Sequence, residues 1–512
     1  MWRCRATWIA RRFNVPRPLA SRLQYRQFSG NELIDRQNHH VLAIETSCDD
    51  TSVALLSNCK ADGEFISKVL FHKRVTADSS SHGGIHPIVA LESHQRNLSH
   101  LVTEAVNCLE HEDVGPEAFY RRRRVKPDLI AVTRGPGMRS NLSVGLNVAK
   151  GLALAWEIPL IGVHHMQAHA LTPRLLSIFK DGDEPPKRFA PDSGQAGLWV
   201  EGEVEPKFPF LTILASGGHT MLVSSNSLVD HKILAETSDI AIGDFLDKAA
   251  RSILPLADLS TPYGKALEDF AFGVTVNDAK HASYHPPRTR QAELERRATK
   301  WGWSLAPPLA ESMGGEKSSR RMMYSFAGLL STIARLTQDS SRSIEERRDL
   351  ARESLRVSFE HLTSRIFIHL QSLTAEEKEK VDTIVVSGGV AANSFLRHVL
   401  RSTLDARGYE RIGLEFPPAE LCTDNALMIA WAGLEMHDAG YESSLEIEAL
   451  RKWSLDPGAE DGGIRGAIGW KTLPPERTHD SDTLMSENSP RPGWVKWVVA
   501  GGLAAGGLSW MT

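Results

Sequence analysis

Short apolar runs alternate with longer segments of helical periodicity along most of the chain. The apolar runs have the length of buried strands, and we expect strands at Val41–Ile44, Val53–Leu56, Leu129–Val132, Leu160–Val163, Leu211–Ala215 and Thr383–Ser387. The helical pattern predicts helices at Asn141–Trp156, Asp244–Ile253, Leu350–Leu373, Ser394–Arg407 and Asn425–Ala439. Strands that alternate with helices indicate an α/β protein whose site lies at the carboxyl ends of the strands.

Two stretches interrupt this pattern. Residues 274–321 are polar, contain two Pro-Pro pairs and the basic run Arg288–Lys300, and predict a long surface insertion. Residues 456–493 are rich in Gly, Pro, Ser and charge, which is typical of a linker. The apolar end that follows, Trp494–Met511, carries four glycines and is near the lower limit of length for a membrane span. Weak membrane contact and a flexible tail both remain open for it.

The composition is that of an ordinary globular protein, with 41% hydrophobic and 24% charged residues. A length of 512 residues allows two or three domains and a large core. The five cysteines include no C-x-x-C pair, so the sequence favours a reducing compartment over a disulfide framework.

Positive charge is concentrated at the start of the chain. Residues 1–30 contain seven arginines and no acidic residue, and removing them takes the formal net charge from −4 to −11. Such an Arg-rich, acid-free segment with interspersed apolar residues is typical of a presequence for import into the mitochondrial matrix. A basic arm that binds RNA or a membrane is the alternative. If the remaining protein binds a polyanion, the local basic clusters Arg121–Lys126 and Arg288–Lys300 are the candidates.

The first candidate for chemistry is an acidic, hydroxyl-rich turn at Glu45–Ser52, between two predicted strands. Hydroxyls and backbone N–H groups can meet a phosphate there, while the carboxylates of Asp49 and Asp50 hold an ion or a water molecule. A plain polar hairpin turn has the same composition, so this segment alone decides little.

Two Ser-Gly-Gly turns form the second candidate. One is Ser216-Gly217-Gly218, and the other begins at Ser387 and continues to Asn393 at the start of a predicted helix. Glycine lets backbone N–H groups approach a phosphate or acyl group closely, and a helix N-terminus favours an anion. A tight hairpin explains the first turn equally well. Two such turns in one chain suggest an internally duplicated fold that holds one nucleotide between its halves.

The third candidate is a histidine pair, His165 and His169, at positions i and i+4. On a helix both imidazoles share one face and can bind a single metal ion. A zinc protease needs Glu after the first histidine as general base, but Met166 stands there and cannot move a proton. Asp424, just before a predicted helix, is a candidate third ligand. Two ordinary histidines remain the alternative.

Taken in order, these motifs resemble the family of tRNA N6-adenosine threonylcarbamoyltransferases, and most closely its mitochondrial branch. The resemblance covers roughly residues 41–455. The motifs that carry it are Ile44–Thr51, Gly83-Gly84, Gly135-Pro136-Gly137, His165–His169, Ser216–Thr220, Asp247-Lys248, Ser325–Leu329, Ser387–Asn393 and Cys422–Asn425.

The resemblance implies the duplicated, two-lobed α/β fold of actin, Hsp70 and sugar kinases, with a nucleotide cleft between the lobes. On that fold we expect the presequence at 1–30, the first lobe at 41–155 with 425–455 packing back on it, the second lobe at 156–424 with its surface insertion at 274–321, and a flexible extension at 456–512.

It also implies roles for individual residues. One divalent metal ion per subunit, iron or zinc, is expected on His165, His169 and Asp424. The acidic pair Asp49 and Asp50 is expected to take part in catalysis. The nucleotide and its acyl substituent are expected on Leu214, Ala215, Ser216, Gly217, Gly218, Asp247, Gly264 and Asn393.

The implied reaction moves a threonylcarbamoyl group from threonylcarbamoyl-AMP, made by a separate synthase, to N6 of an anticodon-loop adenosine in tRNA. Mitochondrial members of the family resemble stand-alone homodimers. Two other classes of function stay open on the residues alone: a metallopeptidase, which Met166 disfavours, and a non-catalytic nucleotide-binding scaffold of the actin/Hsp70 type, which would not need the histidine pair.

Overall fold

The computed structural model describes residues 39–61, 64–79, 85–109, 111–113, 122–124, 126–178, 200–202, 204–273, 281, 283–310, 318–338 and 341–472. All of them belong to one compact unit of the chain. The expected presequence, the apolar end at Trp494–Met511 and parts of the predicted insertion lie outside the described residues. Among the helices that are described, none has the length and hydropathy needed to cross a membrane.

A six-stranded sheet forms the first lobe, in the order β7-β6-β1-β2-β3-β8. β1, β2 and β3 are an antiparallel meander, while β6 and β7 add in parallel on the other side of β1. The bounds are β1 His39–Glu45, β2 Asp50–Ala61, β3 Glu64–Thr76, β6 Leu129–Gly135, β7 Leu160–His164 and β8 Val200–Gly202.

The second lobe repeats this plan in the order β12-β11-β10-β9-β13-β14. β9, β10 and β11 are again an antiparallel meander, and β13 and β14 again add in parallel beside its first strand. The bounds are β9 Phe210–Ala215, β10 Thr220–Ser225, β11 His231–Thr237, β12 Met323–Tyr324, β13 Thr383–Ser387 and β14 Gly413–Glu415. Two short ribbons, β4 His111–Asp113 with β5 Arg122–Arg124 and β15 Tyr441–Ser443 with β16 Trp470–Thr472, lie outside the sheets.

The predicted α/β fold with two duplicated lobes is therefore confirmed. The two Ser-Gly-Gly turns, from which we inferred the duplication, are however not equivalent positions of the two lobes. Both Ser-Gly-Gly turns belong to the second lobe, since they follow the neighbouring parallel strands β9 and β13. The counterpart of Ser216–Gly218 is the acidic turn between β1 and β2. The counterpart of the second glycine turn is Gly135-Pro136-Gly137 after β6. Carboxyl ends of adjacent parallel strands meet at one sheet edge, which brings two similar turns together without any duplication.

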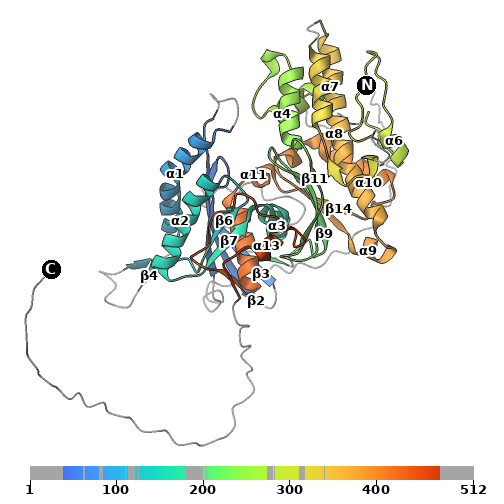
Figure 1. Ribbon diagram of the computed structural model, residues 1–512. Helices are drawn as coiled ribbons and strands as arrows, with labels where there is room; N and C mark the ends of the chain where they lie inside the picture. Colours follow the sequence, from blue (N-terminus) through green and yellow to red (C-terminus); the bar gives the residue numbers. More distant parts are fainter. Residues whose placement is uncertain are drawn as a thin grey trace, which may run out of the picture. The chain divides into compact units, whose positions relative to one another are not determined.

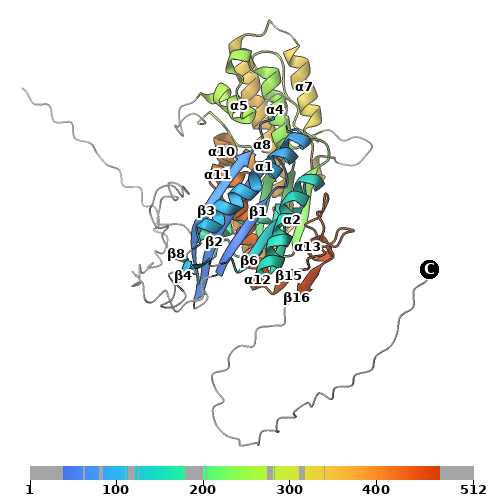
Figure 2. The same cartoon turned by 90° about the vertical axis from the view of Figure 1, so that its left-hand side faces the viewer.

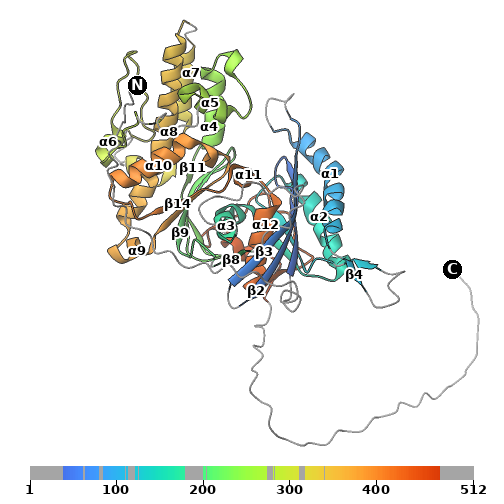
Figure 3. The ribbon, with the colours of Figure 1, turned by 180° about the vertical axis from the view of Figure 1, so that it is seen from behind.

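Helices cover both faces of each sheet. In Figures 1 and 2, α1 (Pro87–Asn107) and α2 (Arg139–Trp156) lie on the outer face of the first sheet. Figure 3 shows α3 (His165–Ser177) and α12 (Ala426–Asp438) between the sheets, and α3 contacts β6 and β7 as well as β9 and β13. The remaining helices are α4 Ile242–Ile253, α5 Tyr263–Phe272, α6 Arg290–Leu294, α7 Ala327–Thr337, α8 Ile344–Ser372, α9 Ala375–Lys380, α10 Ser394–Ala406, α11 Ala419–Cys422 and α13 Gly463–Gly466.

Two strands of the first sheet lie outside the residues that we expected to form the first lobe. β7 and β8 belong to the first sheet although both lie beyond residue 155, in the range that we assigned to the second lobe. The reason is the crossover: α2 returns the chain so that β7 pairs in parallel with β6, as short βαβ connections do. Contacts of α12 with β1, β2, β6 and β7 place the segment after Asp424 against the first sheet. The lobe boundaries themselves stay a prediction.

The described part of the expected insertion packs against the second lobe. Leu305 is buried, and the Trp303 indole donates to Glu346 at 2.8 Å. Arg297 and Lys300, from the basic run, form ion pairs with Glu360 and Glu345. These two cations therefore satisfy acids of α8 within the protein, although the sequence suggested them for a polyanion. The side chains of Arg121–Arg124 lie outside the described ones.

Candidate active site

One cavity of about 570 Å³ is lined by residues of both lobes. Its walls are the turns that follow β1, β6, β9 and β13, together with the first turn of α3 and the segment before α12. This volume is in the range of small-molecule sites. All predicted site residues except Asp247, Gly264 and Asn393 line it: Asp49, Asp50, His165, His169, Leu214, Ala215, Ser216, Gly217, Gly218 and Asp424.

The three predicted metal ligands converge at one point. The Nε2 atoms of His165 and His169 lie 3.3 and 3.1 Å from the same oxygen, Oδ1 of Asp424. His164 caps α3, because its Nδ1 accepts from the backbone N–H groups of the next turn, and this fixes the start of the helix that carries both ligands. The side chain of Asn425 caps α12 in the same way and fixes the position of Asp424 next to it.

A buried carboxylate that the sequence analysis missed stands behind His165. Glu45, the last residue of β1, is fully buried, and its Oε2 lies 3.2 Å from Nδ1 of His165. It also accepts from the Ser47 backbone and from the Thr133 hydroxyl. A carboxylate on the outer nitrogen of a metal-binding histidine fixes its tautomer and raises its basicity. A glutamate that ends an otherwise apolar strand was the signal for it.

Electrostatics at this point favour positive charge. Burial by itself lowers the pKa of His165, but the carboxylates of Asp424 and Glu45 outweigh burial and raise that pKa to about 10. Desolvation raises the pKa of Asp424, whose side chain is half-buried, yet His165 and His169 hold that pKa well below the usual range. Two buried imidazoles and one half-buried carboxylate that stabilise a cation are a suitable site for a divalent metal ion.

One orphaned atom supports the same conclusion. Nδ1 of His169 is buried and has no hydrogen-bond partner among the described residues, while Nε2 faces Asp424. A neutral imidazole carries one N–H, and the tautomer with the proton on Nδ1 frees the Nε2 lone pair for a metal. The residues His165, His169 and Asp424 therefore fit a metal ion, and among the described residues they form the group in which such an ion can be held.

The acidic pair of the first turn lines the same cavity as the glycines. Asp50 opens β2 and is 8% exposed. It accepts from the Thr76 hydroxyl and lies 3.7 Å from the guanidinium of Arg74. Burial raises the pKa of Asp50 to about 6, against the lowering effects of Thr76 and Arg74. A carboxylate with this pKa can accept a proton near neutral pH.

Backbone groups of the glycine turns line the cavity as well. The Ser216 hydroxyl accepts from the N–H groups of Gly218 and His219, which fixes the turn after β9. Gly388 has φ +96°, and a Cβ there would lie 2.4 Å from the oxygen of Ala215. Glycine is therefore required at Gly388, because the two turns approach more closely than a side chain allows. Exposed amides on such turns suit a phosphate or an acyl oxygen.

Three predicted nucleotide residues do not line the cavity. Asp247 on α4 contacts the backbone N–H of Gly264 on α5, so these two are brought together, and burial raises the pKa of Asp247. Asn393 follows the second glycine turn and caps α10 by accepting from Phe395 and Leu396. Glu268 on α5, another residue missed at sequence level, accepts from the next residue, Ser394. α4, α5 and the start of α10 thus form one surface beside the glycine turns.

The fold and the site together define a class of protein. Two duplicated α/β lobes enclose a cavity lined by amide-rich turns, a group of residues that could hold a metal ion, and further carboxylates. Met166 lines this cavity at the position where a zinc protease has its glutamate, and a thioether cannot accept a proton. The class is that of a two-lobed α/β protein with a candidate metal site in a cavity between its lobes.

Comparison with known proteins identifies the family. A sequence model of tRNA N6-adenosine threonylcarbamoyltransferase matches residues 68–191 and 195–431. The mitochondrial enzyme of Schizosaccharomyces pombe is 34% identical over 81% of this chain and 86% of its own length. The enzyme of Zymomonas mobilis is 30% identical over 83% of this chain and 94% of its own length. The chain belongs to the tRNA N6-adenosine threonylcarbamoyltransferase family, and it is a tRNA-modifying acyltransferase.

Solved structures with a similar arrangement are more distant. HypF of T. kodakarensis is 14% identical, with 81% of this chain and 49% of HypF covered and a TM-score of 0.35. A non-polymerising MamK mutant bound to AMPPNP is 13% identical, with 79% and 99% covered and a TM-score of 0.31. Scores this low add nothing to the assignment, which rests on the sheet topology and the family match.

Proposed function

We propose that the chain transfers the threonylcarbamoyl group from threonylcarbamoyl-AMP to N6 of adenosine 37 in mitochondrial tRNAs that read ANN codons. The observation that carries the proposal is that the metal triad and the amide-rich turns line the same cavity. The mitochondrial location is supported by the similarity to the S. pombe enzyme and by the Arg-rich residues 1–30. The adenylate comes from a separate synthase.

In this proposal each wall of the cavity has its own task. The turns Leu214–Gly218 and Gly388-Gly389 hold the phosphate and acyl end of the adenylate through backbone N–H groups, and Asp247, Gly264 and Asn393 hold the nucleoside. The same amides stabilise negative charge that develops as the adenosine amine attacks the carbamoyl carbon and AMP leaves. An exocyclic adenine amine is a poor nucleophile, so positioning supplies much of the acceleration.

The acidic wall handles the proton and the metal. Asp50, with its pKa near neutrality, accepts the proton that the attacking amine loses, and Asp49 lies beside it in the cavity. His165, His169 and Asp424 hold one divalent ion, iron or zinc. Such an ion supplies Lewis-acid polarisation of an acyl oxygen when it is bound.

The proposal includes an organisation for the whole chain. Residues 1–30 direct import into the matrix. Residues 41–155 with 425–455 form the first lobe, which β7 and β8 complete, and the rest of 156–424 forms the second lobe with its insertion. Residues 456–512 are an extension, which begins with a segment that pairs through β16 with β15 and ends in an apolar stretch that makes weak membrane contact. The active unit is a homodimer without further subunits.

Reconstitution tests this function directly. The purified chain is combined with a threonylcarbamoyl-AMP synthase, threonine, bicarbonate, ATP and mitochondrial tRNA, and the nucleosides are analysed by mass spectrometry. We expect modified adenosine at position 37 of tRNAs that read ANN codons and none in other tRNAs. Absence of product with every tRNA, while the synthase makes the adenylate, would contradict the proposal.

The metal assignment has its own matched test. His165→Ala combined with His169→Ala removes two ligands, so we expect loss of bound metal, measured by mass spectrometry of the elements, and loss of transfer. His285→Ala is the control, because the side chain of this exposed histidine of the second lobe bonds the Ser283 carbonyl in its own loop and does not line the cavity. Full activity in the double variant, with its unfolding temperature unchanged, would reject the metal site.

A further inference from the structure

The mouth of the cavity carries one cation whose role the reaction described above does not explain. Among the described residues that line the cavity, Arg451 is the only arginine or lysine. Its side chain is exposed, and no hydrogen bond or ion pair joins its guanidinium to the residues that the structure describes. Lys452, next to it, is exposed as well. The two form a pair of solvent-facing positive charges, of which Arg451 lines the cavity.

The backbone under this pair is held firmly. Leu450 donates to the Arg134 carbonyl at 2.8 Å, and the Arg451 carbonyl accepts from Gly137 at 3.3 Å. Gly135 packs so closely that a Cβ on it would lie 2.1 Å from the Leu450 oxygen. The Trp453 indole donates to Gly463 at 3.0 Å. The segment 450–453 is thus fixed to the turn after β6, which is itself a wall of the cavity, and its cations keep their place beside the mouth.

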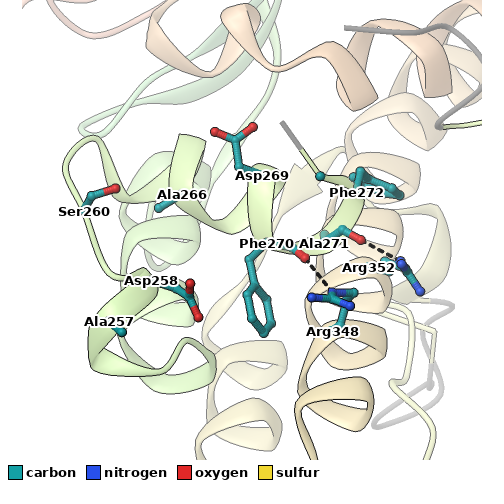
Figure 4. Close-up of a pocket in the computed structure, with 11 residues that line it drawn as sticks. Ala257, Asp258, Ser260, Ala266, Asp269, Phe270, Ala271, Phe272, Arg348 and Arg352 are labelled. Carbon is teal, nitrogen blue, oxygen red and sulfur yellow. Dashed lines mark hydrogen bonds between the residues drawn. The ribbon is translucent and has the colours of Figure 1, made fainter. Parts of the chain in front are cut away.

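A second cavity, within the second lobe, is also lined by arginines, but these have partners within the protein. Figure 4 shows that Arg348 and Arg352 of α8 donate to the carbonyls of Phe270 and Ala271 at the end of α5. Arg352 also bonds Asp349 at 2.9 Å. Both guanidiniums bond carbonyls at the end of α5, and that of Arg352 also pairs with an acid, so they support packing. Arg451 has no such contact among the described residues.

The charge of the tRNA substrate suggests a role for Arg451 and Lys452. The cavity interior holds the carboxylates of Asp49, Asp50 and Asp424, which repel an incoming polyanion. An enzyme that acts on one base takes that base into its pocket while the phosphate backbone stays outside. The phosphates next to the target adenosine therefore come to rest at the mouth, where repulsion from the acidic wall must be offset.

We propose that Arg451, with Lys452 beside it, binds the backbone phosphates that flank the target adenosine of the tRNA. This proposal rests on the use of the cavity as the transfer site. The arginine fork meets a phosphate through two parallel hydrogen bonds, and the lysine adds a point charge. Exposure of both side chains suits a macromolecular anion at the surface better than the small adenylate inside the cavity.

Steady-state kinetics with the full chain test the pair. Arg451→Ala should raise the KM for tRNA about tenfold, with kcat and the KM for the adenylate unchanged, because a charge-assisted contact is lost in binding alone. The slope of the logarithm of tRNA affinity against the logarithm of salt concentration should fall by about one. The KM of Arg451→Lys for tRNA should lie between those of the wild-type chain and Arg451→Ala. Lys452→Ala, combined with Arg451→Ala, should weaken tRNA binding further.

Arg465→Ala is the matched control, since Arg465 is an exposed arginine on the same C-terminal segment that does not line the cavity. It should leave the KM and the salt slope at their wild-type values. If Arg451→Ala instead raised the KM for the adenylate, the arginine would meet the threonine carboxylate and the proposal would be overturned. Unchanged tRNA binding would overturn it too. The affinity for unmodified tRNA, measured without donor, remains informative even if the wild-type chain transfers nothing.

Discussion

The two lobes have the same strand order but use equivalent turns differently. Glu45 ends β1 and pairs with Ser52, while Ala215 ends β9 and pairs with Thr220, so a buried carboxylate and a methyl group occupy the same place in the two sheets. In the first lobe the turn that follows contributes acidic side chains. In the second lobe it contributes Gly217 and Gly218, and with them the bare backbone.

This difference divides the chemistry between the lobes. A carboxylate can hold a proton, orient an imidazole or attract a metal ion. In the first lobe Glu45 contacts His165, and we propose that Asp50 accepts a proton. Backbone N–H groups carry no net charge and cannot titrate, but they stabilise negative charge at any pH. In the proposed function, a ligand held between these turns has its anionic part on the second lobe and its reacting carbon toward the first. Loss of side chains from the first wall should therefore affect chemistry, and loss of side chains from the second should affect local structure.

The largest effect is expected from Asp50→Asn. Asn keeps the size and the contact with Thr76 but cannot accept a proton, so kcat should fall by about a hundredfold or more. In the wild-type chain kcat should rise with pH through about 6, because the raised pKa of Asp50 leaves the carboxyl protonated below that value. The variant should lose this dependence. Rate measurements between pH 5 and about 8 check both.

Unfolding of the same variant separates catalysis from stability. Folding raises the pKa of Asp50 above its unfolded value, so its contribution to stability is fully present below about pH 4 and is lost as pH rises through about 6. At neutral pH the variant should therefore unfold at the same or a higher denaturant concentration than the wild-type chain. A clear loss of stability together with the loss of rate would argue that Asp50 supports the fold instead.

A smaller effect is expected from Glu45→Gln, which tests the support behind the metal triad. A neutral amide holds the Nδ1–H of His165 less strongly, and the affinity for the metal should fall about 10–100-fold. Competition with a chelator measures this affinity without reference to transfer. Glu448→Gln is the matched control, because the same change is made at an exposed ion pair with Arg139. Equal metal affinity in the two variants would show that Glu45 is only structural.

The strands and helices that the sequence predicts are those with a strong local pattern. All six predicted strands and all five predicted helices are present, with ends that differ by a few residues, and α8 begins earlier, at Ile344, because Ser343 caps it. The long strand β2 extends well beyond the predicted Val53–Leu56, and its partner β3 was not predicted. The remainder of β2 and the whole of β3 mix polar and apolar residues, and pairing between neighbours, which a local pattern does not contain, makes them strands.

The site was predictable where chemistry is confined to a short motif. His165 and His169 share a helical face, so their spacing was enough. Glu45 and Arg451 were missed, because their significance depends on distances between segments far apart in the chain: Glu45 meets His165, and Arg451 lies on a loop fixed to β6. The interpretation of the two Ser-Gly-Gly turns as equivalent positions of two lobes fails for the same reason. Similar turns on adjacent strands and equivalent turns in two lobes are indistinguishable until the sheet order is known.

The smallest effect is expected from substitutions of Asn393. They distinguish binding by backbone groups from binding by a side chain in the second lobe. The Oδ1 of Asn393 caps α10, so Asn393→Ala should cost about 1 kcal/mol of unfolding free energy, measured with denaturant. The cost falls at the low end of the range for caps, since Glu268 also accepts from the N-terminal N–H groups of this helix.

Asn393→Ser restores the cap without the amide, and this variant decides the role of Asn393 in the nucleotide site. A serine hydroxyl accepts from the same backbone N–H groups, so stability should return to the wild-type value. The amide NH₂ is lost, and if it holds the nucleoside the KM for the adenylate should stay several-fold higher than in the wild-type chain, by roughly the value of one hydrogen bond. A serine variant with wild-type stability and wild-type KM would restrict Asn393 to capping. The second wall would then bind its ligand through backbone alone, and the contrast with the first lobe would be complete.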